Sequence, residues 1–262
     1  MIVKNIIIYS LLIISLVAFS FTPLETHDYR VKKVVIDAGH GGKDTGTSGA
    51  NTQEKDIVLK IALKLGKLIK ENLKDVEVIY TRTSDKFLTL ENRAKMANKN
   101  GADLFISIHC NSEHTKTVKG AETFVMGLHT SEENLEVAKR ENSVVLLEDD
   151  YHAKYAGYDP NSDESHILFS LFASSYLENS LNLAQKIQYQ FKNRVGRRSR
   201  GVKQAGFVVL WQTSMPSVLV ECGFLSNKSE EQYLNDPLGQ TYIASGLFRA
   251  FRDYKEELES IN

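Results

Sequence analysis

Six short apolar runs are spread along the chain, and each has the length and branched side chains typical of a buried strand. Between them lie stretches with an apolar residue every three or four positions, as expected for helices that bury one side. This alternation predicts an α/β fold, with helices on both faces of a mostly parallel, mixed sheet of about six strands. The predicted strands are VVID (34–37), VEVIYT (76–81), LFISIH (104–109), AETFVM (121–126), GFVVL (206–210) and SVLVEC (217–222).

The helices follow from the same pattern and from their end signals. We find no internal repeat, so the elements predict one domain over residues 31–258. The spacing of Ser229 and Gln232 matches a capping box, which would start a short helix near 230–235. The other predicted helices span 57–73, 89–99, 171–195 and 242–254.

One segment interrupts this alternation. Residues 131–165 carry ten acidic and three basic residues, and their end is rich in turn-forming residues. Excursions of this length inside a compact domain are usually functional or disordered. Shortly afterwards, residues 192–203 carry six basic residues and no acidic one.

The N-terminus does not match the rest of the fold. Lys4 precedes an apolar run from Ile6 to Phe19, which ends in a small-x-small sequence. We predict a signal peptide at 1–20 and a short linker at 21–30, with an uncleaved membrane anchor as the alternative. In either case the protein is exported.

The global charge and the cysteine content narrow the function further. The formal net charge is −1, so any electrostatic role must be local, and nucleic acid is a poor partner for such a chain. The two cysteines, Cys110 and Cys222, allow one disulfide, but both end apolar runs, which favours buried free thiols.

Titratable residues stand at the ends of three of the predicted strands. These are His40, His109 and Glu221, and Glu54 follows His40 by fourteen residues at the start of a predicted helix. Sites in α/β sheets form beyond the carboxyl ends of the strands, so these side chains are expected to converge. Two histidines and one glutamate form a catalytic zinc set with an open position, and a second carboxylate would shuttle protons.

Each of these residues also has a structural interpretation. A strand-end histidine is often only hydrogen-bonded, and Glu54 could cap a helix together with Asn51. Glu221 could be half of a buried ion pair. The spacing alone leaves these alternatives open.

Longer motifs resemble a known family. In order along the chain they are VVIDAGHGGKDTG, EKDIVLKIALKL, YTRTSDKFLTLENRAKMAN, SIHCN and QAGFVVL with MPSVLVECGFLSN. Together they resemble the zinc-dependent N-acetylmuramoyl-L-alanine amidases of the amidase-3 family. The resemblance implies a single-domain α/β fold, and one Zn²⁺ per chain bound by His40, Glu54 and His109. It implies that Glu221 is the catalytic carboxylate and that the substrate is peptidoglycan.

The bond implied by this resemblance joins N-acetylmuramic acid to the L-alanine of the stem peptide. Two other functions stay open at this point, a zinc peptidase that cuts within the stem peptide and a non-catalytic wall-binding protein. Asn111 is a candidate substrate contact because it points to the same side as His109. Asp37 could orient an imidazole, whereas Arg82 and Arg93 are more consistent with buried ion pairs or loop fixing than with substrate contact.

The acidic segment also resembles part of a known group. The sequences AKRENS and SYLENSLNLAQKIQ are similar to the insert of the periplasmic division-type amidases. This resemblance implies that the insert at 131–165 blocks the zinc until an activator protein withdraws it. Glu148 and Glu164 are the candidate blocking residues, and a solvated acidic loop is the alternative. The basic run at 192–203 could be a solvated helix end, pair with the acidic insert, or attract the anionic wall.

Overall fold

The computed structural model describes residues 30–129, 131–170 and 175–260. The expected signal peptide at 1–20 and nearly all of the expected linker at 21–30 lie outside these described residues. Within the described ranges, no helix is both long enough and apolar enough to cross a bilayer.

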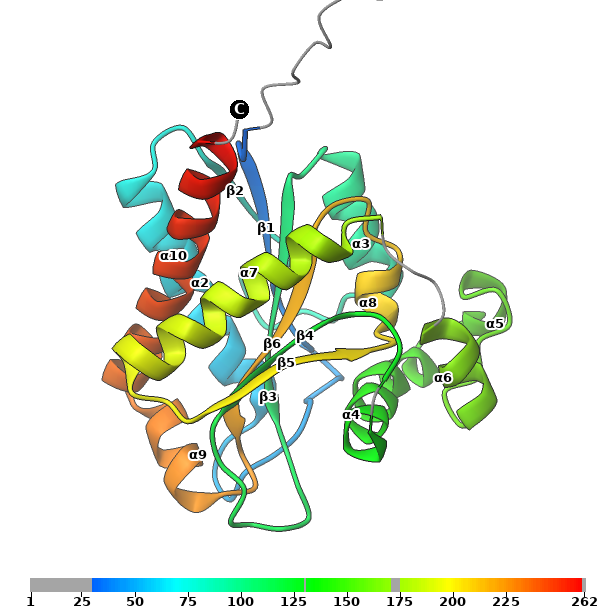
Figure 1. Cartoon of the computed structure of the whole chain (residues 1–262). Coiled ribbons are helices and arrows are strands. Elements are labelled where there is room, and N and C mark those ends of the chain that lie inside the picture. The colour runs from blue at the N-terminus through cyan, green and yellow to red at the C-terminus, as the bar shows by residue number, and fades with distance from the viewer. Residues whose placement is uncertain (1–29, 130, 171–174, 261–262) are drawn as a thin grey trace, which may run out of the picture.

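A mixed sheet lies at the centre of the molecule (Figure 1). Its six strands are β1 (Lys33–Ala38), β2 (Glu77–Tyr80), β3 (Leu104–Asn111), β4 (Ala121–Met126), β5 (Ser199–Ala205) and β6 (Ser217–Phe224). Their order is β2-β1-β3-β6-β4-β5. All neighbouring pairs are parallel except β4 and β6, which are antiparallel. The predicted α/β sandwich with a mostly parallel, mixed sheet is therefore confirmed.

One face of the sheet is covered by three long helices, α2 (Glu54–Asn72), α7 (Leu177–Gln190) and α10 (Pro237–Ser260), as Figure 1 shows. The short helix α9 (Lys228–Asn235) adds Leu234 to the same core. The apolar stripes that predicted α2 and α10 are the surfaces that these helices bury, so both predictions are confirmed.

The other face is covered by α3 (Leu90–Lys99), by α8 (Val208–Trp211) and by the acidic segment. That segment contains α4 (Glu132–Asn142), the 3₁₀ turn η1 (Ser143–Leu147), α5 (Tyr151–Lys154) and the start of α6 (Asp163–Ser170). Val137, Val144 and Tyr155 from this segment are buried in the same core as Phe105 of β3. The insert is therefore a packed helical layer rather than a loose loop.

Three element predictions were wrong in part. Residues 206–210 were expected to form a strand, but they contain the start of α8, because a short apolar run cannot distinguish a strand from a buried helix. The strand lies just before, at β5, within the basic run. The long helix expected over 171–195 is α7 followed by a π turn at Phe191–Val195, and residues 171–174 lie outside the described ranges. Helix α9 is capped by Asn227, which accepts from the Ser229 and Glu230 amides, rather than by Ser229.

Strand alternation decides which side carries the candidate chemistry. Ile108 and Cys110 of β3 face the core under α2, α7 and α10, so His109 between them faces the insert. Glu221 faces the same way, because its neighbours Val220 and Cys222 belong to the core under the long helices. Both cysteines are buried free thiols that point away from His109.

Candidate metal centre and catalytic site

The loop after β1 presents His40 in an unusual backbone conformation. His40 has a φ of 58°, in the left-handed region that residues other than glycine rarely adopt. Two buried arginines fix this loop. Arg93 donates to the His40 carbonyl at 2.7 Å, and Arg82 donates to the Gly39 carbonyl at 2.6 Å. Both arginines therefore act on the loop backbone, as favoured by the sequence.

Asp37 lies beneath this loop and does not orient an imidazole, so that expectation was wrong. Its carboxylate is fully buried and accepts from Arg93 at 2.7 Å and from the Thr81 and Ser107 hydroxyls, each at 2.7 Å. Burial raises the pKa of Asp37, but Arg93 and the two hydroxyls outweigh it and hold the pKa below 3.8. The imidazole is oriented instead by Asp44, whose Oδ2 lies 2.8 Å from His40 Nδ1.

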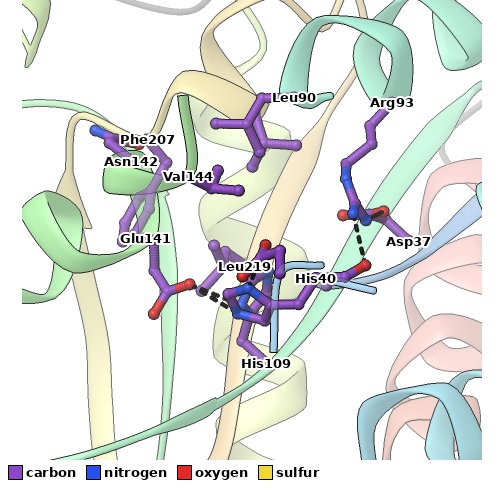
Figure 2. A pocket seen from close by; sticks show the side chains of 13 residues that line it. Asp37, His40, Leu90, Arg93, His109, Glu141, Asn142, Val144, Phe207 and Leu219 are labelled. Atoms are coloured by element: carbon purple, nitrogen blue, oxygen red, sulfur yellow. Dashed lines mark hydrogen bonds and ion pairs between the residues drawn. The ribbon is translucent and has the colours of Figure 1, made fainter. Parts of the chain in front are cut away.

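Four side chains from distant parts of the sequence meet at the end of the sheet. Glu54 Oε1 lies 3.1 Å from both His40 Nε2 and His109 Nδ1. Glu141 Oε2 lies 3.2 Å from the same His40 nitrogen and 3.0 Å from the same His109 nitrogen. Figure 2 shows Glu141 pointing at the two imidazoles. The structure thus brings together His40, Glu54 and His109, as the sequence predicted, and adds Glu141.

Glycines permit this close approach. A Cβ on Gly46 would lie 2.5 Å from Glu54 Oε2 and 2.6 Å from His40 Cδ2, and Gly46 also has a φ of 63°. A Cβ on Gly39 would overlap the His109 ring. The glycine-rich loop therefore leaves room for the two imidazoles and Glu54 to face one another.

The electrostatics of the cluster favour a cation at its centre. Burial lowers the pKa of His109, but Glu141 and Glu54 reverse this and raise it to about 10. Burial raises the pKa of Glu54, but His40 and His109 lower it to about 2 despite the nearby Glu141. The carboxylates thus stay ionised and strongly favour positive charge between the imidazoles.

The donor atoms also lie close enough together to share one metal ion. Ligands about 2.0–2.2 Å from a zinc ion at tetrahedral angles lie roughly 3.3–3.6 Å apart. The four contacts measured here are 3.0–3.2 Å, and all four donor atoms lie within 4.8 Å of one another. His40 Nε2 and Glu141 Oε2 are buried without a hydrogen-bond partner, as expected of groups whose natural partner is a cation.

Glu221 lies beside this cluster. It pairs in register with His109 on the neighbouring strand and is fully buried. Among the residues that the structure describes, neither carboxylate oxygen has a hydrogen-bond partner, and Arg140 Nη2 lies 3.9 Å from Oε1. Burial, then Glu141 and Glu54, raise the pKa of Glu221 well above its usual value. The contact with Arg140 is too long for a strong ion pair, so a structural ion pair does not account for Glu221.

The insert glutamate that lies at the cluster is neither of the two expected from the sequence. Glu148 was a candidate, but it accepts from the Leu90 amide at 3.0 Å and from the Tyr155 hydroxyl at 2.9 Å. Glu164, the other candidate, accepts from the Ser162 hydroxyl at the exposed start of α6. Glu141, on the buried side of α4, is the insert glutamate at the cluster.

Asn111 lies next to the site but is fully engaged. Its Nδ2 donates to Glu122 at 2.6 Å, and its Oδ1 accepts from Arg140 at 2.7 Å. Asn111 therefore connects the edge of the sheet to the insert helix. Its expected contact with substrate stays a prediction.

Comparisons with known proteins match this chain in both sequence and fold. The Amidase_3 family model, described as N-acetylmuramoyl-L-alanine amidase, matches residues 34–253. AmiA of Salmonella typhimurium is 35% identical over 228 residues, which cover 84% of this chain and 75% of AmiA. An N-acetylmuramoyl-L-alanine amidase structure from Clostridium difficile 630 has a TM-score of 0.64 at 31% identity, covering 87% of this chain and 98% of that one. The CwlD amidase of Clostridioides difficile, solved in complex with the GerS lipoprotein, has a TM-score of 0.64 at 28% identity, covering 86% and 99%.

Proposed function

Because this chain belongs to the amidase-3 family of N-acetylmuramoyl-L-alanine amidases, it is a hydrolase of peptidoglycan, and we propose that it is a zinc enzyme held inactive by its own insert. The bond hydrolysed joins N-acetylmuramic acid to the L-alanine of the stem peptide. The single observation that carries the proposal is the buried convergence of two imidazoles and two carboxylates around one point.

His40, Glu54 and His109 would hold the zinc ion. When bound, zinc acts as a Lewis acid on the amide carbonyl and lowers the pKa of water at its open position toward about 7. Asp44 supports this role, because its bond to His40 Nδ1 leaves Nε2 directed at Glu54. The arginines under the loop keep the His40 backbone in place.

Glu221 is the proposed proton carrier. It takes a proton from the attacking water while the water oxygen bonds to the amide carbon. It then delivers that proton to the nitrogen as the carbon–nitrogen bond breaks, so the products are a carboxylate on the muramic acid and a peptide with a free L-alanine amine. A positioned acid–base group typically contributes about 10²–10⁴-fold in rate. The place of Glu221 beside His109, buried and without a hydrogen-bond partner, supports this role.

The insert, residues 131–165, would hold the enzyme inactive through Glu141. In the closed arrangement Glu141 takes the fourth position that water must occupy. Arg140 reinforces this closure, because its Nε donates to Glu141 at 3.1 Å and its Nη2 donates to Asn111. Substrate can reach the metal only after α4 moves away.

An activator protein would displace the insert. Leu146 and Leu147 of the insert, and Leu168 just after it, are large apolar side chains left exposed, so they offer a surface that a partner could engage. The CwlD amidase, which shares this fold, was solved in complex with the GerS lipoprotein. That complex supports the idea that amidases of this fold bind protein partners.

Export follows from the substrate and the N-terminal sequence. Peptidoglycan lies outside the cytoplasmic membrane, and the apolar run before Ser20 matches a signal peptide. We therefore propose residues 1–20 as the signal, 21–30 as a linker and 31–258 as the catalytic domain, acting in the periplasm or cell envelope.

The test is mass spectrometry of purified peptidoglycan after digestion by the purified chain, with and without a chelator. The proposal predicts intact stem peptides with a new L-alanine amine, and no products when the metal is removed. Products that leave alanine on the glycan would identify a peptidase instead. A complete absence of products, even for a variant with Glu141 replaced, would indicate a non-catalytic wall-binding protein.

A further inference from the structure

A bulge in β5 brings two cations to one side of the sheet. Ala121 of β4 pairs with Ser199 of β5, and Thr123 pairs with Val202. Two residues of β4 therefore pair along three residues of β5, so β5 holds one extra residue. Gly201, within the bulge, has a φ of 91°. In a regular strand, side chains three positions apart face opposite sides. The bulge re-aims them, so that both Arg200 and Lys203 reach the same carboxylate, Glu122.

Each of these two cations contacts the same two carboxylates. Arg200 Nε lies 2.9 Å from Glu122 Oε2 and Lys203 Nζ lies 2.7 Å from the same atom. Glu133, in the first turn of α4, pairs with Arg200 and lies 3.4 Å from Lys203 Nζ. Glu122 is fully buried in the sheet, whereas Glu133 is 42% exposed and belongs to the insert. If the insert leaves, each cation keeps Glu122 but is separated from its second anionic partner.

This cation pair lies in line with the catalytic site. Glu221 pairs with His109 on one side and with Glu122 on the other, and directly paired residues face the same side of a sheet. The charged groups of Arg200 and Lys203 lie at Glu122 on β4, and β4 is two strand spacings, or about 9–10 Å, from β3. A groove of about 660 Å³ is lined by Arg200 and Glu133 of the subsite and by Ser112 and Arg140, which lie next to the catalytic site.

We propose that Arg200 and Lys203 form a subsite for a carboxylate of the stem peptide, and that Glu133 occupies this subsite while the insert is closed. The inference deepens the proposed amidase function and rests on it. An extended peptide spans about 3.3–3.6 Å per residue, so a carboxylate about three residues from the cleaved amide would reach this subsite. The C-terminal carboxylate and an acidic side chain near it are the two sources of this group.

The subsite is built before the ligand arrives. The Arg200 guanidinium lies 5.1 Å over the Phe224 ring and is anchored by Glu122, which leaves its Nη2 directed at Glu133. A guanidinium held in this way suits a carboxylate better than a flexible surface lysine does. Glu133 thus shows, with a group of the chain itself, how an acid is bound there.

The insert contact and the substrate contact are separated by working with Glu133→Gln, which removes the insert carboxylate from the subsite. All variants in this test also carry Glu141→Gln, which opens the metal site, so that hydrolysis can be measured in each of them. Glu136→Gln is the matched control, because Glu136 lies on the same helix and pairs with Lys139 rather than with β5. Arg200→Gln and Lys203→Gln are each added to Glu133→Gln, and Arg200→Lys tests rescue by a conservative change. Thermal unfolding identifies any variant that fails to fold, and the Lys203 variant then carries the test.

Binding is measured by calorimetry with free stem peptides that carry all carboxylates, a C-terminal carboxamide, or side-chain carboxamides. Hydrolysis of the matching muramyl peptides is measured in parallel. We expect Glu133→Gln to bind the peptide with all its carboxylates about 10- to 100-fold more tightly than one of the two carboxamide peptides. The carboxamide that weakens binding shows which carboxylate, C-terminal or side-chain, occupies the subsite. Adding Arg200→Gln should abolish the preference, raising KM on the acid substrate but leaving kcat unchanged.

Equal binding of acid and amide peptides by Glu133→Gln would overturn the inference, as would a preference that survives both Arg200→Gln and Lys203→Gln. A preference in binding without hydrolysis of any muramyl peptide would refute the proposed amidase function and leave the subsite intact.

Discussion

Replacing Glu141 by glutamine removes the negative charge that we propose closes the site, while it keeps the volume of the side chain. Glu141 is only 5% exposed, and one of its oxygens lies 3.0 Å from His109 Nδ1 and 3.2 Å from His40 Nε2. The rest of α4 keeps its packing through Leu135, Val137 and Ala138. The substitution therefore weakens the closed state with little effect on the fold.

The size of the effect follows from the negative charge that Glu141 places beside the cation at the centre of the site, which glutamine does not carry. A single charge-assisted contact contributes about 1.5–3 kcal/mol, and every 1.4 kcal/mol changes an equilibrium tenfold. The fraction of molecules with an open site should thus rise roughly 10- to 100-fold. The rate without any partner should rise by the same factor, until most molecules are open. Deleting residues 131–165 is a poorer test, because it would expose Phe105 and the core around it.

The assay is the initial rate of release of dye-labelled fragments from peptidoglycan, without added partner protein. Glu136→Gln is the control, since its side chain is 58% exposed and contacts Lys139. Its rate should equal that of the wild type. If Glu141→Gln were folded and retained zinc but hydrolysed peptidoglycan no faster than the control, the insert would not be inhibitory.

Three further outcomes are expected. His40→Ala should lose both its activity and its zinc, and elemental analysis measures the zinc. Stoichiometric zinc retained in this variant would exclude His40 as a ligand. Glu221→Gln, combined with Glu141→Gln, should retain zinc but lose at least about 10²-fold in kcat, and unchanged turnover would exclude Glu221 as the proton carrier. Arg93→Met should cost about 3–5 kcal/mol in urea unfolding because it leaves Asp37 buried without its cation. The pKa of Asp37 is held below 3.8 in the folded protein, so its ionised form stabilises the wild-type fold above that pH. This contribution is lost as the pH falls through the pKa that Asp37 has in the folded state. In Arg93→Met the pKa should rise, so acid unfolding should begin at higher pH, and an unchanged acid midpoint would contradict the assigned role of Arg93.

The strand ends were the most informative part of the sequence. His40, His109 and Glu221 each close an apolar run, and parallel strands bring their carboxyl ends to one edge. Asp44 could not be predicted because it lies in an irregular glycine-rich loop, where no periodicity indicates which side chains face each other. The burial of Asp37 was foreseeable, but its partner was not, because Arg93 reaches it from a separate helix.

The insert was harder to predict because it contains ten acidic residues, and charge alone does not distinguish one from another. A signal was nevertheless present. Glu141 follows Asn134 and Ala138 at the spacing of one helix face, and all three are buried. A glutamate on the buried stripe of an otherwise exposed acidic helix needs a partner, and this argument would have selected Glu141 over Glu148 and Glu164.

The basic run shows why β5 was missed. Arg200 and Lys203 make this stretch look like a solvated helix end. It is stabilised as an edge strand by tertiary contacts, namely its parallel pairing with β4 and the ion pairs with Glu122 and Glu133. Pairing with the acidic insert is one of the alternatives that the sequence leaves open for this run, and it is the one found in the structure.

The most direct test is an anomalous difference map at the zinc absorption edge from crystals of the purified protein grown with zinc. The account predicts one strong peak per chain, about 2.0–2.2 Å from His40 Nε2, His109 Nδ1 and a Glu54 oxygen, with Glu141 as the fourth ligand. A zinc-saturated crystal with its strong peak elsewhere, or with no peak between these three side chains, would contradict it.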